Sequence, residues 1–279
     1  MQKFFYGWYL KNQSDTQTLA IIPAVHQSGR KRTASIQIIT NNGVYTAIFP
    51  GVAYMRRGSK IYIGRNNFGK NGIRLSIDTP KLKVKGKLRF GTLSPLKYDI
   101  MGPFCLLPFM ECRHSVKSMK HAVYGKICIN GQKYNFQNAQ GYWEGDRGIS
   151  FPKKYVWTQC FYQGGSVMLS VADIPFAKKY FTGIIGVVLW KGREYRLATY
   201  LGAKVMHKGN QIIKVVQDDM ELEAILLEEK RKPLRAPDGG SMVRIIHESV
   251  VCRAFYRFKK HGCTVFSFET DMASFEYEY

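Results

Sequence analysis

The chain has 279 residues, of which 45% are hydrophobic and 14% aromatic, enough to bury the cores of one large or two modest domains. Its six cysteines show neither a C-x-x-C pair nor a metal-type spacing with histidines. No apolar run approaches the roughly 18 to 20 residues that span a bilayer, and the N-terminal stretch lacks a secretory core. We therefore expect no disulfide framework, zinc site, transmembrane helix or export. We expect a cytoplasmic location.

The charge is strongly unbalanced. Forty-two lysines and arginines against 20 acidic residues give a formal net charge of +22. Such a charge attracts an anionic partner, which could be a nucleic acid, a phospholipid surface or an acidic ligand. Because the sequence contains no stacking pair, recognition helix or finger of a nucleic-acid module, nucleic acid is disfavoured. Peripheral contact with an anionic membrane surface stays compatible with the charge.

The first clear elements along the chain form a hairpin. Residues 35–40 (SIQIIT) and 44–49 (VYTAIF) flank Asn41-Asn42-Gly43, which is strong turn chemistry. Residues 81–90 (KLKVKGKLRF) then alternate basic with apolar side chains, the period of a strand with one solvated and one buried face. We interpret this run as the exterior of a barrel rather than as a nucleic-acid stripe.

Short alternating segments separated by turn residues recur to the end of the chain. Their spacing is typical of roughly fifteen to twenty antiparallel strands. Residues 218–231 (DDMELEAILLEEKR) could form an amphipathic helix, but their apolar residues also alternate as in a strand, and we favour the strand.

This number of strands exceeds what one compact barrel needs, so we predict an all-β fold of two linked antiparallel β-barrels. Residues 103–112 (PFCLLPFMEC) interrupt the strand rhythm and mark the region between the barrels. We place the N-terminal barrel at residues 1–135 and the C-terminal barrel at residues 136–279.

Common catalytic motifs are missing from the sequence. It contains no G-x-S-x-G elbow, phosphate-binding glycine loop, G-x-G-x-x-G or H-E-x-x-H. We therefore predict neither a cofactor nor a metal, and the candidate chemistry lies in carboxylates and histidines set among aromatic residues.

The strongest candidates lie in residues 141–157 (GYWEGDRGISFPKKYVW). If this stretch is extended, Glu144, Asp146 and Tyr142 share one face, and one face of a barrel strand looks into the lumen. A carboxyl group in an aromatic lumen is desolvated, which raises its pKa, and a second carboxyl beside it raises one of the two further. The alternative is a turn in which Asp146 accepts backbone hydrogen bonds.

Two histidines lie just upstream, in residues 110–125 (MECRHSVKSMKHAVYG). His114 and His121 are seven residues apart, so they would face opposite sides of a strand but the same side of a helix. Either could orient a carboxylate or take a proton from a phenol. The alternative for each is a structural histidine in the core or in a loop.

Several further residues could contact a substrate, because large rings can line a pocket or stabilise a cation by ~0.5 to 2 kcal/mol. The alternative for the aromatic residues is a place in the core. For Lys154 it is an exposed position outside any site, and for Asp173 it is a structural hydrogen bond. The predicted substrate-binding residues are Trp8, Tyr9, Trp143, Trp157, Lys154 and Asp173.

Taken together, several blocks of the sequence resemble the tocopherol cyclase family, which includes the plant enzyme that closes the chromanol ring of vitamin E. No single block is specific, but they follow in order along nearly the whole chain. They are residues 4–11 (FFYGWYLK), 110–125, 141–160, 172–176 (ADIPF), 181–190 (FTGIIGVVLW), 195–205 (YRLATYLGAKV), 234–237 (LRAP), 242–249 (MVRIIHES) and the ending ASFEYEY.

The resemblance implies two lipocalin-like β-barrels, related to those of carotenoid hydratases, that hold an apolar ligand. It also implies a cofactor-independent cyclase in which an acid, Asp146 or Glu144, protonates an alkene and His114 or His121 acts as base or orienting group. With water admitted, the same site would be a hydratase. The alternative from another class is a lipocalin-like protein that binds an apolar ligand without turnover.

One departure from the family concerns the acids themselves. Where the plant proteins tend to have E-K-N-W-G, this chain has Glu144-Gly145-Asp146-Arg147-Gly148, with an acid in place of an amide and an arginine in place of a tryptophan. The substrate therefore need not be a tocopherol precursor.

Overall fold

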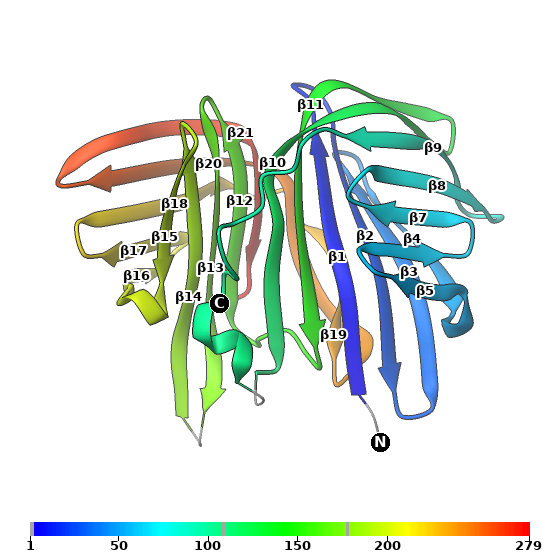
Figure 1. Cartoon of the computed structure of the whole chain (residues 1–279), viewed down its shortest axis with the longest axis horizontal. Helices are drawn as coiled ribbons and strands as arrows, with labels where there is room; N and C mark the ends of the chain where they lie inside the picture. Colours follow the sequence, from blue (N-terminus) through cyan, green and yellow to red (C-terminus); the bar gives the residue numbers. More distant parts are fainter. Residues whose placement is uncertain (1–2, 108–109, 177–178) are drawn as a thin grey trace. The chain divides into compact units, whose positions relative to one another are not determined.

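The computed structural model describes residues 3–107, 110–176 and 179–279 (Figure 1). Within them it contains strands β1 to β21, three short 3-10 helices and no α-helix. The all-β prediction is therefore confirmed. None of the helices in these residues is long and apolar enough to cross a bilayer.

The strands form two antiparallel sheets. The first sheet contains β1 (Lys3–Gln13), β2 (Thr18–Ser28), β3 (Lys31–Thr40), β4 (Val44–Pro50), β5 (Tyr54–Arg57), β6 (Lys60–Ile63), β7 (Asn66–Gly69), β8 (Gly72–Asp78), β9 (Lys83–Phe90), β10 (Cys112–Ile129) and β11 (Gln132–Gly148). The second contains β12 (Tyr155–Tyr162), β13 (Gly165–Phe176), β14 (Lys179–Trp190), β15 (Arg193–Ala198), β16 (Lys204–Gly209), β17 (Ile212–Gln217), β18 (Met220–Glu228), β19 (Lys232–Asp238), β20 (Ser241–Lys260) and β21 (Cys263–Tyr277). The 3-10 helices are η1 (Gly51–Ala53), η2 (Gly102–Leu106) and η3 (Thr199–Leu201).

Each sheet is curled around its own hydrophobic core. The strand order of the first sheet is β4-β3-β2-β1-β11-β10-β9-β8-β7-β6-β5, so its two edge strands follow one another in the chain (Figure 1). Side chains from all along this order meet in one core, which includes Trp8, Ile36, Ile61 and Leu88. The second sheet repeats this plan, with β15 and β16 at its edges and a core that includes Val188.

The described chain divides into two compact units, each assembled from three segments. Unit 1 is Met1–Lys97, Glu111–Phe151 and Arg235–Arg244, and unit 2 is Tyr98–Met110, Pro152–Leu234 and Ile245–Tyr279. The boundary expected between residues 135 and 136 lies inside β11. The division into domains at residues 1–135 and 136–279 stays a prediction.

Several local predictions match the strands. The hairpin expected over residues 35–49 is formed by β3 and β4, and the basic run of residues 81–90 contains β9. Residues 218–231 contain β18, so the strand and not the helix is present. The stretch expected between the barrels, residues 103–112, includes most of η2 and also residues 108–109, which lie outside the described residues.

Candidate active site

The candidate site is built on the hairpin of β10 and β11. The turn between these strands consists of Asn130 and Gly131, whose φ angles are 47° and 88°. Positive φ at both residues is what a two-residue hairpin turn requires. The turn pairs Ile129 with Gln132 and so sets the register from which the rest of the ladder is counted.

Irregularities in both strands of the β10–β11 ladder then change this register. If the pairing that starts at the turn continued without irregularities, His114 would lie opposite Arg147. In the structure His114 lies opposite Asp146. Because successive residues of a strand face opposite sides, this shift of one residue brings the imidazole to the face that carries the carboxylates. The site therefore depends on the bulges of the β10–β11 ladder as well as on the residues that it contains.

Glu144 and Asp146 lie within a strand, because β11 continues to Gly148. The alternative of a turn at Asp146 is therefore wrong. Tyr142, Glu144 and Asp146 share one face as predicted, and Trp143 on the other face packs into the core of unit 1. The carboxylates consequently point away from that core and not into the lumen of the barrel, where the sequence had suggested them.

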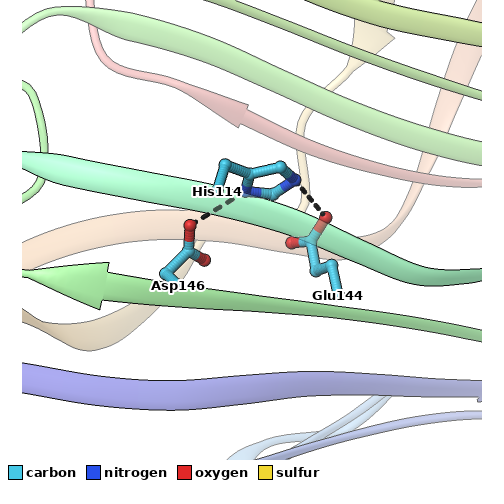
Figure 2. Close-up of side chains that lie close together, drawn as sticks. All are labelled: His114, Glu144 and Asp146. Atoms are coloured by element: carbon cyan, nitrogen blue, oxygen red, sulfur yellow. Dashed lines mark hydrogen bonds and ion pairs between the residues drawn. The ribbon is translucent and has the colours of Figure 1, made fainter. Parts of the chain in front are cut away.

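Two carboxylates bind one imidazole from opposite sides (Figure 2). His114 Nδ1 lies 2.8 Å from Asp146 Oδ1, and His114 Nε2 lies 3.2 Å from Glu144 Oε2. The Tyr142 hydroxyl donates a hydrogen bond of 2.5 Å to the same Glu144 oxygen. Cys112 Sγ donates to Asp146 Oδ1 over 3.6 Å. His114, Glu144 and Asp146 are called the proton cluster below.

The proton cluster is largely buried. The side chains of His114, Glu144 and Asp146 are 12%, 6% and 18% exposed. Burial by itself would lower the pKa of His114, but the charges of Asp146 and Glu144 and the hydrogen bonds to both raise it well above its usual value. The resting cluster therefore holds a proton on the imidazole, between two carboxylates.

The other two donors stay neutral. Burial, the charge of Glu144 and the hydrogen bond to it raise the pKa of Tyr142 well above its ordinary value. Burial and the charge of Asp146 likewise raise the pKa of Cys112. Tyr142 and Cys112 therefore act as hydrogen-bond donors that hold the two carboxylates in place, and the Cys112 thiol is not activated as a nucleophile.

The same three residues could be considered as metal ligands, since their ligand atoms lie within 4.8 Å of one another. The two carboxylates, however, contact different ring nitrogens, whose lone pairs diverge. The geometry therefore fits a shared proton better than a three-ligand metal site.

His121 lies apart from the proton cluster, opposite Gly141 in the ladder. Its ring packs against Phe90, and its Nδ1 lies 3.0 Å from Ser118 Oγ. Since Ser118 Oγ donates to the carbonyl of Lys120, it accepts from Nδ1, which leaves Nε2 as a buried acceptor without a partner in the described residues. Burial lowers the pKa of His121 to about 4, so this histidine is neutral.

The predicted rings of unit 1 separate onto two faces. Trp8 and Trp143 pack edge to face in the core, on the side of the sheet away from the carboxylates. Tyr9 lies opposite Glu144 in the ladder of β1 and β11, so it shares the face of the proton cluster. Of these three predicted substrate-binding residues, only Tyr9 is therefore next to the candidate site.

The remaining predicted residues belong to unit 2. Trp157 is buried in β12, opposite Ser170 of β13. Asp173 forms an ion pair with Lys208 and accepts a hydrogen bond from Thr182, and Lys154 is exposed. The contacts of Asp173 are those of a structural acid, which was the alternative considered for it.

Sequence reasoning assigned no role to Tyr142 or Cys112. Tyr142 was expected on the face of Glu144, and the i, i+2 spacing was the signal that could have identified it as a partner. Cys112 is likewise two residues before His114 on β10. Its contact with Asp146 depends on the bulges, and no pattern in the sequence indicates it.

The two curled antiparallel sheets give the chain a lipocalin-like fold, in which the hydrogen-bonded ladders of the described strands do not close either barrel completely. Residues 79–201 match the family model described as tocopherol cyclase-like, and the proton cluster lies within them. The resemblance seen in the sequence is therefore confirmed over this segment.

Two solved structures share the fold. A protein assigned as AttH from Nitrosomonas europaea is 11% identical, with a TM-score of 0.57 over 99% of this chain and 93% of that one. A kievitone hydratase from Nectria haematococca is 8% identical, with a TM-score of 0.56 over 99% of this chain and 88% of that one. At such identities the likeness establishes the fold alone. A search of curated protein sequences gave no match.

Proposed function

We propose that this protein is a cofactor-independent enzyme that protonates an alkene of an apolar prenylated phenol and closes a ring on the resulting cation. The observation that carries this proposal is the imidazole of His114 between two carboxylates that are largely buried. The match of residues 79–201 to the tocopherol cyclase-like family supports it.

The proton must pass to a carboxylate before it can reach an alkene, because an imidazolium of raised pKa is too weak an acid. Binding of an apolar substrate supplies a reason for this transfer. When the substrate displaces water, the charged pair of His114 and a carboxylate becomes less favourable than the neutral pair of imidazole and carboxylic acid. The substrate thereby generates the acid that protonates it.

Asp146 is the better candidate for the acid that touches the substrate. Its side chain is 18% exposed, against 6% for Glu144. Both of its contacts in the described residues use Oδ1, which leaves Oδ2 available. Glu144 is instead held by Tyr142 and His114, so it orients the imidazole and keeps a negative charge near the developing cation.

The reaction then returns the proton. Protonation of the less substituted alkene carbon leaves a tertiary cation, which the carboxylate and the ring of Tyr9 would stabilise. The phenol oxygen attacks this cation and loses its proton to His114, which restores the resting cluster. Atoms balance without any cofactor, because the substrate and the cyclic product are isomers.

Hydration of the alkene is the second candidate reaction. It uses the same protonation step, with water in place of the phenol as nucleophile. The partial exposure of Asp146 and His114 favours it, and a kievitone hydratase shares the fold. A third outcome, binding of an apolar ligand without turnover, would leave the cluster with only a structural role.

The test uses the purified protein with simple prenylated phenols in deuterated water and no added cofactor. Protonation of the alkene would place one deuterium on the product carbon, and mass spectrometry would distinguish the cyclic isomer from the hydrate. Asp146→Asn should lower the rate by about 10² to 10⁴-fold. The matched control is Asp15→Asn, which changes an exposed acid of unit 1. Turnover that survives in folded Asp146→Asn would contradict the assignment of the acid.

A further inference from the structure

A strongly basic surface in unit 1 has no role in the proposed reaction. Residues 54–90 contain eleven lysines and arginines and a single acid, Asp78. The strands in this segment, β5 to β9, alternate so that apolar residues such as Ile61, Leu75 and Leu88 enter the core. The charged residues that alternate with them in β8 and β9, such as Arg74 and Lys87, are consequently displayed on the outer face of the sheet.

Pairing of the strands brings these charges side by side. Arg74 of β8 lies opposite Lys87 of β9, and Lys87 lies opposite Lys126 of β10. Side chains at paired positions are about 5 Å apart, where like charges repel. All three are exposed, and none of them forms an ion pair within the part of the chain that the structure describes. We call the following six exposed residues the basic face: Arg74, Lys85, Lys87, Arg89, Lys126 and Lys133.

Apolar side chains continue this surface toward the edge of the sheet. The cross-strand row of Arg74 runs through Asn67 and Tyr62 to Met55 of β5. Met55 is 41% exposed, and Val52 in the adjoining η1 is 94% exposed. Ile48 of the neighbouring edge strand β4 is 69% exposed. An array of cations therefore borders a group of exposed apolar side chains.

We propose that this surface docks unit 1 onto a bilayer that contains anionic lipids. Lysines and arginines are attracted to anionic headgroups, and neighbouring apolar side chains can enter the acyl boundary. A nucleic acid would use the cations but would gain nothing from Val52, Ile48 and Met55. The bilayer therefore accounts for both halves of the surface, and the proposal does not depend on the reaction at the proton cluster.

Vesicle sedimentation tests the basic face directly. The wild-type protein should sediment with vesicles of phosphatidylcholine and phosphatidylglycerol, less with phosphatidylcholine alone, and much less near ~0.5 M salt. The triple variant Arg74→Gln, Lys87→Gln and Lys126→Gln should bind more than ten-fold more weakly, since each charge contributes roughly five-fold.

A matched control removes the same charge from unit 2. Lys191, Arg193 and Lys204 are exposed there. If the vesicles are attracted by the basic face and not by the net charge of the protein, changing all three to Gln should alter vesicle binding by less than about two-fold. The apolar part is tested by Val52→Ser, which should weaken binding several-fold while leaving its salt dependence unchanged. Equal binding by the two triple variants would overturn the proposal.

Two further readouts distinguish lipid binding from unfolding and from nucleic-acid binding. Because the three basic side chains repel one another, their replacement should leave the melting temperature unchanged or raise it, so a loss of vesicle binding cannot come from unfolding. Wild-type binding to a labelled nucleic acid, stronger than to vesicles and insensitive to Val52→Ser, would assign the surface to nucleic acid instead.

Discussion

His114 and His121 belong to the same strand, seven residues apart, and both are largely buried, yet their protonation states are opposite. His114 lies between two carboxylates, and its pKa is raised well above the usual value. His121 faces Phe90 and Ser118, and burial lowers its pKa to about 4. Burial alone therefore does not determine the charge of a histidine here, because the residues on the facing strand decide it.

The ladder explains why the two positions differ. His121 is paired with Gly141, which has no side chain, and a Cβ at that position would lie 2.2 Å from His121 Nε2. His114 is paired with Asp146 and is diagonal to Glu144. One strand thus carries a charged histidine suited to proton transfer and a neutral one that belongs to the packing.

The largest effect expected from this difference concerns activity. His114→Gln should lower the turnover of a prenylated phenol by about 10² to 10⁴-fold, because the cluster loses the group that stores and accepts the proton. The measurement is single-turnover product formation on protein verified as folded. His207→Gln, at an exposed histidine of unit 2, is the matched control. Comparable rates for the two variants would remove His114 from the mechanism.

The next largest effect is on acid stability, and it comes from His121. Its folded pKa of about 4 lies below the unfolded value near 6.5, so the unfolded state binds more protons between these values. Stability is full above about pH 6.5 and falls by about 3 kcal/mol as the pH drops to about 4. Urea unfolding of wild type and His121→Asn across this range would show the loss, which the variant should lack. An unchanged slope in the variant would contradict the assignment.

His114 should show the opposite behaviour on the alkaline side. Its folded pKa is raised, so its contribution to stability is present below the unfolded pKa and is lost as the pH rises through the folded pKa. Asp146→Asn removes one of the two charges that raise the pKa of His114, so this pKa should fall toward its usual value. The titration is followed by nuclear magnetic resonance of the imidazole. A pKa that does not fall would mean that Asp146 is not its partner.

The smallest effect is expected for Tyr142. Tyr142→Phe removes the hydroxyl that donates to Glu144 but keeps the ring, and it should cost about 1 to 3 kcal/mol of unfolding free energy. Thermal and urea denaturation would measure this cost. A loss as large as that of Asp146→Asn in the activity assay would make Tyr142 more than a residue that positions Glu144.

Patterns of period two made much of the fold predictable. The alternation in residues 81–90 and 218–231 identified β9 and β18, and the Asn41-Asn42-Gly43 turn identified the first hairpin. The same period placed Glu144 and Asp146 on one face. These inferences succeeded because strand geometry and turn chemistry are local.

The pairing of His114 with Asp146 could not be predicted in the same way. It depends on irregularities in both strands of the β10–β11 ladder, which together shift the register by one residue, and Asn138 in β11 has a left-handed φ of 51° at one of them. The direction of the acids, away from the core of unit 1, was also missed, because alternation does not say which face of a barrel strand is inside. For the same reason Trp8 and Trp143 were grouped with a site on the other face.

The ¹⁵N shifts of His114 at neutral pH, in uniformly labelled wild-type protein, test the central claim most directly. A proton held between two carboxylates predicts an imidazolium, with hydrogen on both Nδ1 and Nε2, that persists well above pH 6.5 while His121 stays neutral with hydrogen on Nδ1. A neutral His114 at pH 7 would contradict the account, because the cluster would then have no stored proton to deliver.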